Sequence, residues 1–408
     1  GCVDGWCALH ERFGRLPMRD VLEPAHAYAA GGFLASPTLA RAAPSVATRA
    51  GADAFASATH AGAIVRRPGV GRTLSAIAGG GRDAFYRGEF GAGLLALGDG
   101  EYADDDLAHV NADWVQPLSV DAWERRLWTI PPNSQGYLTL ASSWIAAGLP
   151  LPDDPDSELW AHLTVEAARA AAYDRDDVLH EGADGSALLD PSRLAPRRDG
   201  IRTETAAVYD AESYAGGGTI YLCAVDADRM GVSLIQSNAA GFGSLLAERS
   251  TGIFLQNRGI GFSVDPDHPA AYGPRRRPPH TLSPALVTTT DGALELVIGT
   301  MGGDAQPQVV LQLLTRLLHA RKTVGDAIAA PRWVLSGQPP FGNGFDTWQQ
   351  RGRVQVHLED DAPPQWEIGL RARGHDVVRH PPLGYNVGHA HAIGVRGHAL
   401  EAASDPRS

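Results

Sequence analysis

The feature that most constrains this chain is a change of character at Thr219. The residues before it are rich in Ala and follow helical spacing, and 157–174 is a strong amphipathic helix candidate. After it, the β-rich runs 220–225 and 232–236 flank a turn and predict a hairpin. The glycine triplet 216–218 separates the two parts. A helical half followed by a strand-rich half favours an α+β protein in which helices cover sheets in layers.

Other segments follow from the same patterns. A helix is predicted over 18–34, where Gly31 and Gly32 act as a stop signal. The polar stretch 175–218, which contains prolines and ends in the glycine triplet, predicts an exposed and mobile connector. The remaining predicted elements are three strands and one helix: strands 252–256, 285–290 and 294–298, and helix 307–318.

Composition excludes several classes of protein. The chain has 408 residues, enough for a sizeable core, and a formal charge of −12 without an aromatic–basic stripe, so we expect no nucleic-acid partner. No run approaches the ~20 apolar residues of a membrane span. Three cysteines without paired spacing predict neither a disulfide framework nor a zinc site. The chain begins at Gly1 without a visible signal peptide, so we expect a processed chain or a fragment, and the cytoplasm is favoured.

Thr219 is the strongest candidate for chemistry. An internal threonine hydroxyl is a poor nucleophile, but a threonine with a free α-amino group has its own general base, because that amine titrates near neutrality. Cleavage of the 218–219 bond would create this arrangement, and the preceding glycines allow the strained backbone that such cleavage needs. Taken locally, an ordinary threonine at the start of a strand remains the alternative.

Several blocks of sequence extend this hypothesis over the whole chain, which ends in ASDPRS: GCVDGWCALHERFGRLPMRDVLEPAHAYAAGGF, IPPNSQGYLTL, TIYLCAVDADRMGVSLIQS, GFGSLLAERSTGIFLQN, RRRPPHTLSP and GTMGGD. In this order they resemble the γ-glutamyltranspeptidase family. The resemblance runs from the first residue to the last. Ordered blocks over a whole chain are a more specific signal than any single motif.

The resemblance implies a fold, a maturation step and roles for residues. The fold would be the four-layer αββα sandwich of the N-terminal nucleophile hydrolases, without part of its N-terminal region. Cleavage would separate a large-subunit portion, 1–218, from a small subunit, 219–408, whose Thr219 is the nucleophile. Ser237 would support its amine, and the N–H groups of Gly302 and Gly303 would bind the oxyanion; the alternative for these glycines is a tight turn. All these groups belong to the protein, so we expect no metal and no cofactor.

The chain departs from the family where the substrate is recognised. Glutamyl-specific members use an acidic residue in an Asn-Gln-x-Asp-Asp-Phe-Ser block, whereas this chain places Gly261 at the second Asp position and Arg258 at the Gln position. His280 and Thr281 replace the family's paired serines. We expect Asn257, Arg258, His280 and Thr281 to bind substrate. Arg258 suits an anionic acyl group without an α-amino group, such as glutaryl; the alternative is a surface arginine in a divergent loop.

Three functions follow from these observations. The first is a self-processing γ-glutamyl transferase or hydrolase that forms an acyl-enzyme on Thr219 from γ-glutamyl amides such as glutathione, with an amino acid, a peptide or water as acceptor. The second is an amidohydrolase of the same fold for glutaryl or other acyl amides, similar to the cephalosporin acylases. The third is a non-catalytic or unprocessed relative.

Overall fold

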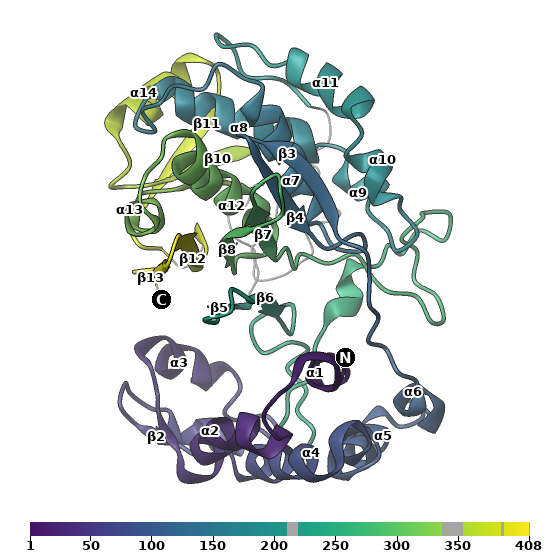
Figure 1. Cartoon of the computed structure of the whole chain (residues 1–408). Helices are drawn as coiled ribbons and strands as arrows, with labels where there is room; N and C mark the ends of the chain where they lie inside the picture. The colour runs from purple at the N-terminus through teal and green to yellow at the C-terminus, as the bar shows by residue number, and fades with distance from the viewer. Residues whose placement is uncertain (210–218, 337–353, 385–386, 408) are drawn as a thin grey trace. The chain divides into compact units, whose positions relative to one another are not determined.

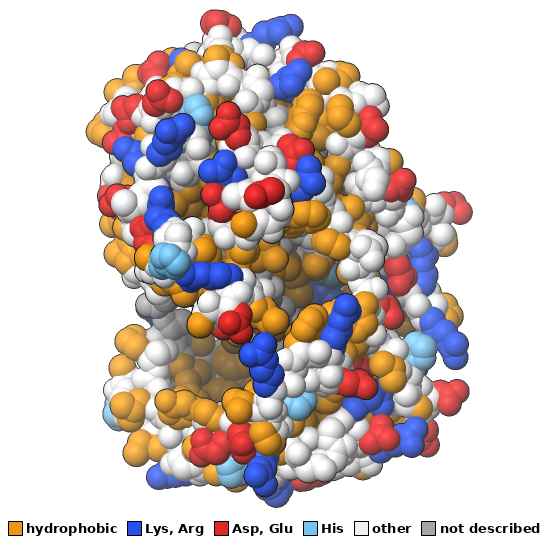
Figure 2. Space-filling view, viewed as in Figure 1, with side chains coloured by type: hydrophobic (Ala, Val, Ile, Leu, Met, Phe, Trp, Pro, Cys, Tyr) orange, Lys and Arg blue, Asp and Glu red, His pale blue; other side chains and the backbone are white. Residues whose placement is uncertain are grey.

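The computed structural model describes residues 1–209, 219–336, 354–384 and 387–407, and these form two compact units (Figure 1). Unit 1 consists of Gly1–Trp114 and Phe242–Asn257, and unit 2 contains the rest of the chain. The predicted α+β class is confirmed, because both helices and antiparallel sheets are present. Over these four ranges, no helix combines the length and the apolar character that crossing a membrane requires. Figure 2 shows acidic and basic side chains interspersed on the face in view.

Unit 1 is mainly helical. Aromatic residues contribute to both of its cores: Phe55 and Phe254 lie in one, and Phe85 stacks on Phe90 in the other with ring centroids 4.2 Å apart. Its predicted helix over 18–34 ends at Gly31, as the glycine stop indicates. Its elements are α1 Cys2–Phe13, α2 Met18–Gly31, β1 Phe33–Leu34, α3 Pro37–Ala42, β2 Ile64–Val65, α4 Pro68–Tyr86, α5 Glu89–Gly98 and α6 Asp104–Ala108.

The predicted strand 252–256 in unit 1 is wrong. The Glu248 carboxylate accepts the backbone N–H groups of Ser250 at 2.9 Å and Thr251 at 2.8 Å, which folds the chain into a turn. Gly252 follows with φ +69, outside the β region. Phe254 keeps a single isolated bridge, to Ala247, so the segment lacks the ladder that defines a strand.

The core of unit 2 is a six-stranded antiparallel sheet in the order β13-β12-β8-β7-β4-β3. The predicted strands 285–290 and 294–298 are confirmed as β7 and β8, while the β3–β4 hairpin lies in the half that was predicted to be helical. The strands are β3 Leu118–Ala122, β4 Arg125–Thr129, β7 Ala285–Thr288, β8 Leu294–Thr300, β12 Ala390–Arg396 and β13 Ala399–Ser404.

The two faces of strand β8 separate two layers. Ile298 belongs to the large apolar core that the helices α7 Tyr137–Ala147 and α12 Gln306–Leu314 share. On the opposite face, a Cβ at Gly299 would meet the Tyr221 ring, and Val297 lies beneath Gly231. Tyr221 and Gly231 belong to the predicted hairpin, which is confirmed as β5 Ile220–Val225 and β6 Gly231–Gln236. The described part of unit 2 therefore has a helical layer, the sheet and the hairpin, and the fourth layer of the sandwich remains a prediction.

Helix α8 Glu158–Ala172 is the buried centre of the helical layer. Ser157 caps its N-terminus, because the Ser157 hydroxyl accepts the Leu159 N–H at 3.2 Å. Trp160 at its start stacks on Trp366, with ring centroids 5.4 Å apart. The remaining elements around it are α13 Val324–Ala329 and α14 Pro364–Ala372, with a three-stranded sheet of β9 Trp333–Ser336, β10 Gln355–Glu359 and β11 Asp376–His380. The predicted helix 307–318 begins as α12 and ends in a π-helix, Thr315–His319.

The predicted exposed connector 175–218 is wrong over its first part. Residues 175–199 contain α9 Arg175–Val178, α10 Gly185–Leu188 and α11 Pro191–Asp199. Aspartates 184 and 190 cap two of these helices, and Leu188 and Leu194 are buried in the core of unit 2. Short capped helices with one apolar face are polar on average, which is why composition suggests a loop. Residues 210–218 lie outside the described residues.

Candidate active site

The predicted nucleophile lies at the open end of the β5–β6 hairpin. Ile220 pairs with Gln236, so Thr219 and Ser237 are the next opposed positions. Their hydroxyl oxygens are 3.3 Å apart, within hydrogen-bond distance. Ser237 also accepts the backbone N–H of Ala239 at 2.9 Å, which fixes its side chain. The hairpin register thus explains why two hydroxyl residues eighteen positions apart meet.

Arg258 joins this pair from a short 3₁₀ turn, Arg258–Gly261. Its Nη2 donates to the Ser237 hydroxyl at 2.9 Å, and its side chain is half-buried. Burial lowers the pKa of Arg258 to about 10, and the Asp304 carboxylate opposes that shift, so the guanidinium stays charged at neutral pH. Arg258 is therefore a partly buried cation that contacts Ser237, and its role in binding substrate stays a prediction. Thr219, Ser237 and Arg258 form a hydrogen-bonded row with a cation at its end.

Gly261, at the position of the family's acidic residue, is buried against the loop that carries His280. A Cβ on Gly261 would overlap the backbone carbonyl oxygen of Pro279 and come within 3.3 Å of Pro278. The local packing therefore excludes any side chain here.

We expect Gly261→Asp to destabilise the protein by about 1–3 kcal/mol, because a side chain overpacks a tight site, and not to create an ammonium site. Thermal unfolding and γ-glutamyl anilide kinetics would check this. Gly259→Asp is the matched control, since nothing lies within 4 Å of a Cβ at Gly259. A stable Gly261→Asp protein with improved γ-glutamyl turnover would contradict the packing argument.

The Gly302–Gly303 turn adopts a backbone conformation that favours glycine. Both glycines have positive φ, +136 and +59. The side chain of Gln135, from the predicted Pro-Pro-x-Ser-x-Gly segment, donates to the carbonyls of Gly303 at 3.0 Å and Thr281 at 3.2 Å. Its own backbone N–H donates to the His280 carbonyl at 2.9 Å. Gln135 thereby ties three separated motifs together.

His280 and Thr281 are placed differently. Burial, with the charges of Arg258 and Arg277, lowers the pKa of His280 to about 3, so its ring is neutral; Nδ1 accepts the Leu282 N–H at 3.2 Å. Thr281 is 1% exposed, so its side chain lies within the fold and a direct contact with substrate stays a prediction. Asn257 is the last residue of the second segment of unit 1, and its role in binding substrate stays a prediction.

Two residues that interact with the predicted site residues were not predicted from the sequence. Asp304, directly after Gly303, forms a buried ion pair with Arg175, N to O 2.8 Å, and acts electrostatically on Arg258. Gln135 is the other. Both belong to sequence blocks that resemble the family, so the block resemblance was the available signal. Arg175 carries no such signal.

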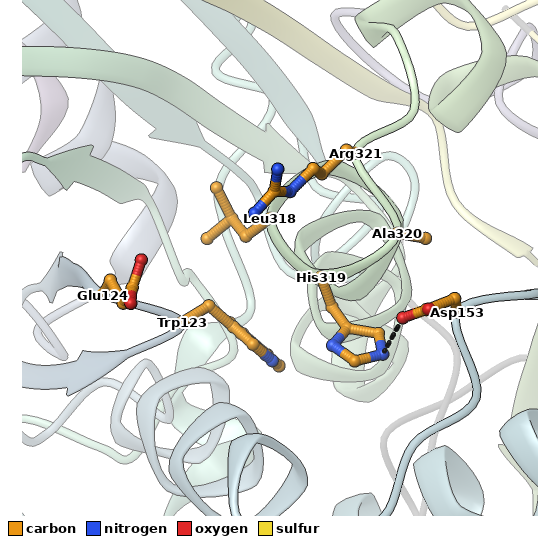
Figure 3. Close-up of a pocket in the computed structure, with 7 residues that line it drawn as sticks. All are labelled: Trp123, Glu124, Asp153, Leu318, His319, Ala320 and Arg321. Atoms are coloured by element: carbon orange, nitrogen blue, oxygen red, sulfur yellow. Dashed lines mark ion pairs between the residues drawn. The ribbon is translucent and has the colours of Figure 1, made fainter.

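A separate pocket of about 590 Å³ lies in unit 2 (Figure 3). In it, Nε2 of His319 lies 3.6 Å from the Asp153 carboxylate, which makes an ion pair when the histidine is protonated. Its other lining residues are Trp123, Glu124, Leu318, Ala320 and Arg321, and none of the predicted catalytic residues is among them. In the part of the chain that the structure describes, no group of three or more His, Cys, Asp or Glu side chains could hold a metal ion.

Comparison with known proteins shows the class of enzyme to which this chain is similar. The structure of cephalosporin acylase from Bacillus halodurans superimposes on 100% of this chain and on 76% of its own chain, with a TM-score of 0.86 and 29% identity. The fold and the site thus define an enzyme similar to the acylases with an N-terminal nucleophile. The chain belongs to the γ-glutamyltranspeptidase family, whose model matches residues 1–408. The resemblance inferred from the sequence blocks is confirmed.

Two curated relatives are similar over most of the chain. One is the oxamate amidohydrolase proenzyme of Klebsiella pneumoniae, 36% identical over 361 residues, which cover 86% of this chain and 66% of the relative. The other is the glutathione hydrolase-like YwrD proenzyme of Bacillus subtilis, 35% identical over 433 residues, which cover 100% of this chain and 78% of the relative. Both names contain the word proenzyme, which describes a precursor that is processed.

Proposed function

We propose that this enzyme cleaves itself before Thr219 and then hydrolyses amides whose acyl group carries a carboxylate and lacks an α-amino group. The observation that carries this proposal is the hydrogen-bonded row of Thr219, Ser237 and Arg258, which places a guanidinium cation one hydroxyl away from the nucleophile. Cleavage would give fragments 1–218 and 219–408 in a four-layer αββα sandwich, of which the helical layer, the sheet and the hairpin support three layers.

The chemistry follows from these groups. The free α-amine of Thr219 takes the proton of its own hydroxyl, and Oγ1 attacks the amide carbonyl. The N–H groups of the Gly302–Gly303 turn stabilise the tetrahedral oxyanion. When the intermediate collapses, the C–N bond breaks and the leaving amine takes the proton back from the Thr219 ammonium. Water then attacks the ester on Oγ1, and the acid and the free Thr219 hydroxyl are released. An amino acid or peptide amine attacking in place of water would give transfer.

Charge and space favour the anionic acyl group. Arg258 can bind a carboxylate through charge-assisted hydrogen bonds. At the same site Gly261 offers no acidic partner for an ammonium, and Pro279 leaves no room for one. The name of the Klebsiella pneumoniae relative points the same way, because oxamate is an amide with an adjacent carboxylate and no ammonium.

Hydrolysis or transfer of γ-glutamyl amides such as glutathione is the second candidate. Its support is the name of the Bacillus subtilis relative, together with that of the glutathione hydrolase proenzyme of Pseudomonas aeruginosa, which is 29% identical over 438 residues.

Glutaryl and γ-glutamyl anilides separate the two candidates. A lost charged hydrogen bond to the α-ammonium costs about 1.5–3 kcal/mol, so we expect roughly 10- to 100-fold lower kcat/KM for the γ-glutamyl substrate. Arg258→Met should raise KM for glutaryl anilide. Arg275→Met, which removes an equal charge from an exposed loop, is the control and should leave KM unchanged. A clear preference for γ-glutamyl anilide would overturn the anionic-acyl proposal.

A further inference from the structure

Residues 201–209, which we call the strap, are the last described residues before Thr219, and two side chains of α8 hold them. Glu166 and Arg169 form an ion pair at 2.9 Å, with the Glu166 side chain fully buried and that of Arg169 10% exposed. Glu166 accepts the Ala207 N–H at 2.8 Å, and Arg169 donates to the Ala207 carbonyl at 3.0 Å. The pair therefore binds both backbone groups of a single strap residue.

The end of the strap is held by aromatic and cationic contacts. The Tyr209 ring stacks on Tyr173 with centroids 4.9 Å apart and planes 9° apart. The Arg169 guanidinium lies 5.2 Å from the centre of the Tyr209 ring. Val208, between the two bound residues, is 89% exposed. Polar and stacking contacts, together with partial burial of the Tyr209 ring against the core, therefore set the position of this end.

The strap is also held by residues that follow Thr219 in the sequence. Arg373 donates to the Thr203 carbonyl at 2.8 Å, and its own carbonyl accepts the Ala206 N–H at 2.7 Å. His375 is hydrogen-bonded at 2.9 Å to His162, whose other ring nitrogen is 2.7 Å from the Arg202 carbonyl. Residues before and after the 218–219 bond thus contribute together to the site that binds the strap.

A buried ion pair is an inefficient way to stabilise a fold, because removing two charges from water offsets most of their attraction. The best-attested use of such a pair is to fix the register in which one segment of chain packs on another. Here the register is that of Ala207, about twelve residues before Thr219, and about twelve residues span at most ~43 Å even when extended. The start of the segment that leads to the 218–219 bond is therefore fixed on α8.

We propose that Glu166 and Arg169 are positioning residues for self-cleavage: they fix Ala207 so that the 218–219 bond is presented to the Thr219 hydroxyl. This inference rests on the proposed self-processing. It predicts that the pair matters for maturation and not for turnover of substrate, because neither residue belongs to the cluster around Thr219.

The test compares the rate of precursor cleavage with the turnover of the cleaved enzyme. The double variant Glu166→Leu/Arg169→Met removes both charges and leaves no unpaired ion, so it should fold. Displacement of the strap should slow cleavage by roughly 10- to 100-fold, as small misplacements of reacting groups do. The kcat of the fraction that does cleave should stay within about twofold of the parent value, since no catalytic group has changed.

Asp4→Asn is the matched control. Asp4 is likewise a fully buried carboxylate that pairs with an arginine, Arg82, and accepts a backbone N–H, from Asn111 at 3.0 Å, but it belongs to unit 1. It should lower the unfolding temperature without slowing cleavage. Normal cleavage in the double variant, or slowing no greater than that of an equally destabilised Asp4→Asn protein, would overturn the positioning role.

Hydrogen exchange separates this inference from the proposed function. In the Thr219→Ala chain the Ala207 amide should be protected, and adding the double substitution should remove that protection. A parent chain that never cleaves at 218–219 would end both proposals. A parent that cleaves, with a double variant that cleaves equally fast, would end the positioning role alone.

Discussion

Thr219→Ala is expected to remain a single 43.2 kDa chain and to lose amide hydrolysis entirely. The substitution removes Oγ1, which we propose attacks first the carbonyl of residue 218 and then the substrate. Loss of a nucleophile that acts as a unit with its base costs about 10⁴-fold or more in kcat. A denaturing gel and an anilide assay on the purified protein would measure both effects.

Thr219→Ser is the control for this result. It keeps a hydroxyl at the same position, so it should still cleave and should retain measurable turnover. In the parent protein, mass analysis of the small fragment should give Thr219 as its first residue. A different first residue would contradict the assignment of the nucleophile, even if the chain is processed.

Gly303→Val should lose most of its kcat with little change in KM. Gly303 has φ +59, a conformation that a β-branched residue adopts only with strain, so its N–H should turn away from the oxyanion. Removing one oxyanion donor typically costs about 10²–10³ in kcat. Steady-state kinetics on the cleaved variant would measure the change.

Gly397→Val is the control for backbone strain. Gly397 has φ +58, lies in the exposed turn between β12 and β13, and has open space around the position of a Cβ. It should lose stability and keep its turnover. Gly299→Ala, beside the turn, would be an unsuitable control because its Cβ would meet the Tyr221 ring. Near-normal turnover of Gly303→Val would place the oxyanion donors elsewhere.

The parts of the site that could be predicted depend on local pattern. The β-rich runs 220–225 and 232–236 predict a hairpin, and the resemblance to the family predicts a role for Ser237; the register that places Ser237 opposite Thr219 comes from the structure. The cap at Ser157 is equally local. The predicted strand 252–256 is wrong for a reason that is also local. The Glu248 carboxylate accepts two nearby N–H groups and turns the chain, and this becomes visible only in the folded structure.

The parts that could not be predicted depend on long-range contacts. The two hydrogen bonds of the Gln135 side chain reach residues 146 and 168 positions away, and nothing next to Gln135 in the sequence indicates them. The sequence predicts a role for Arg258, but its hydrogen bond to Ser237, 21 positions away, needs the folded structure. Helices 175–199 are polar on average, and their buried leucines find partners only in the assembled core.

The six-stranded sheet pairs β4, from before Thr219, with β7, from after it. A molecule cut at 218–219 would therefore keep its ladder, but its halves would no longer be tethered. Refolding would become a bimolecular reaction that loses the effective concentration of the intact chain. Heat or denaturant should then show hysteresis: the uncut Thr219→Ala chain recovers after unfolding, whereas the mature enzyme does not at low concentration. The chain would fold efficiently only before the cut, while its halves are still covalently joined. The lifetime of the mature enzyme would then be set by its unfolding rate.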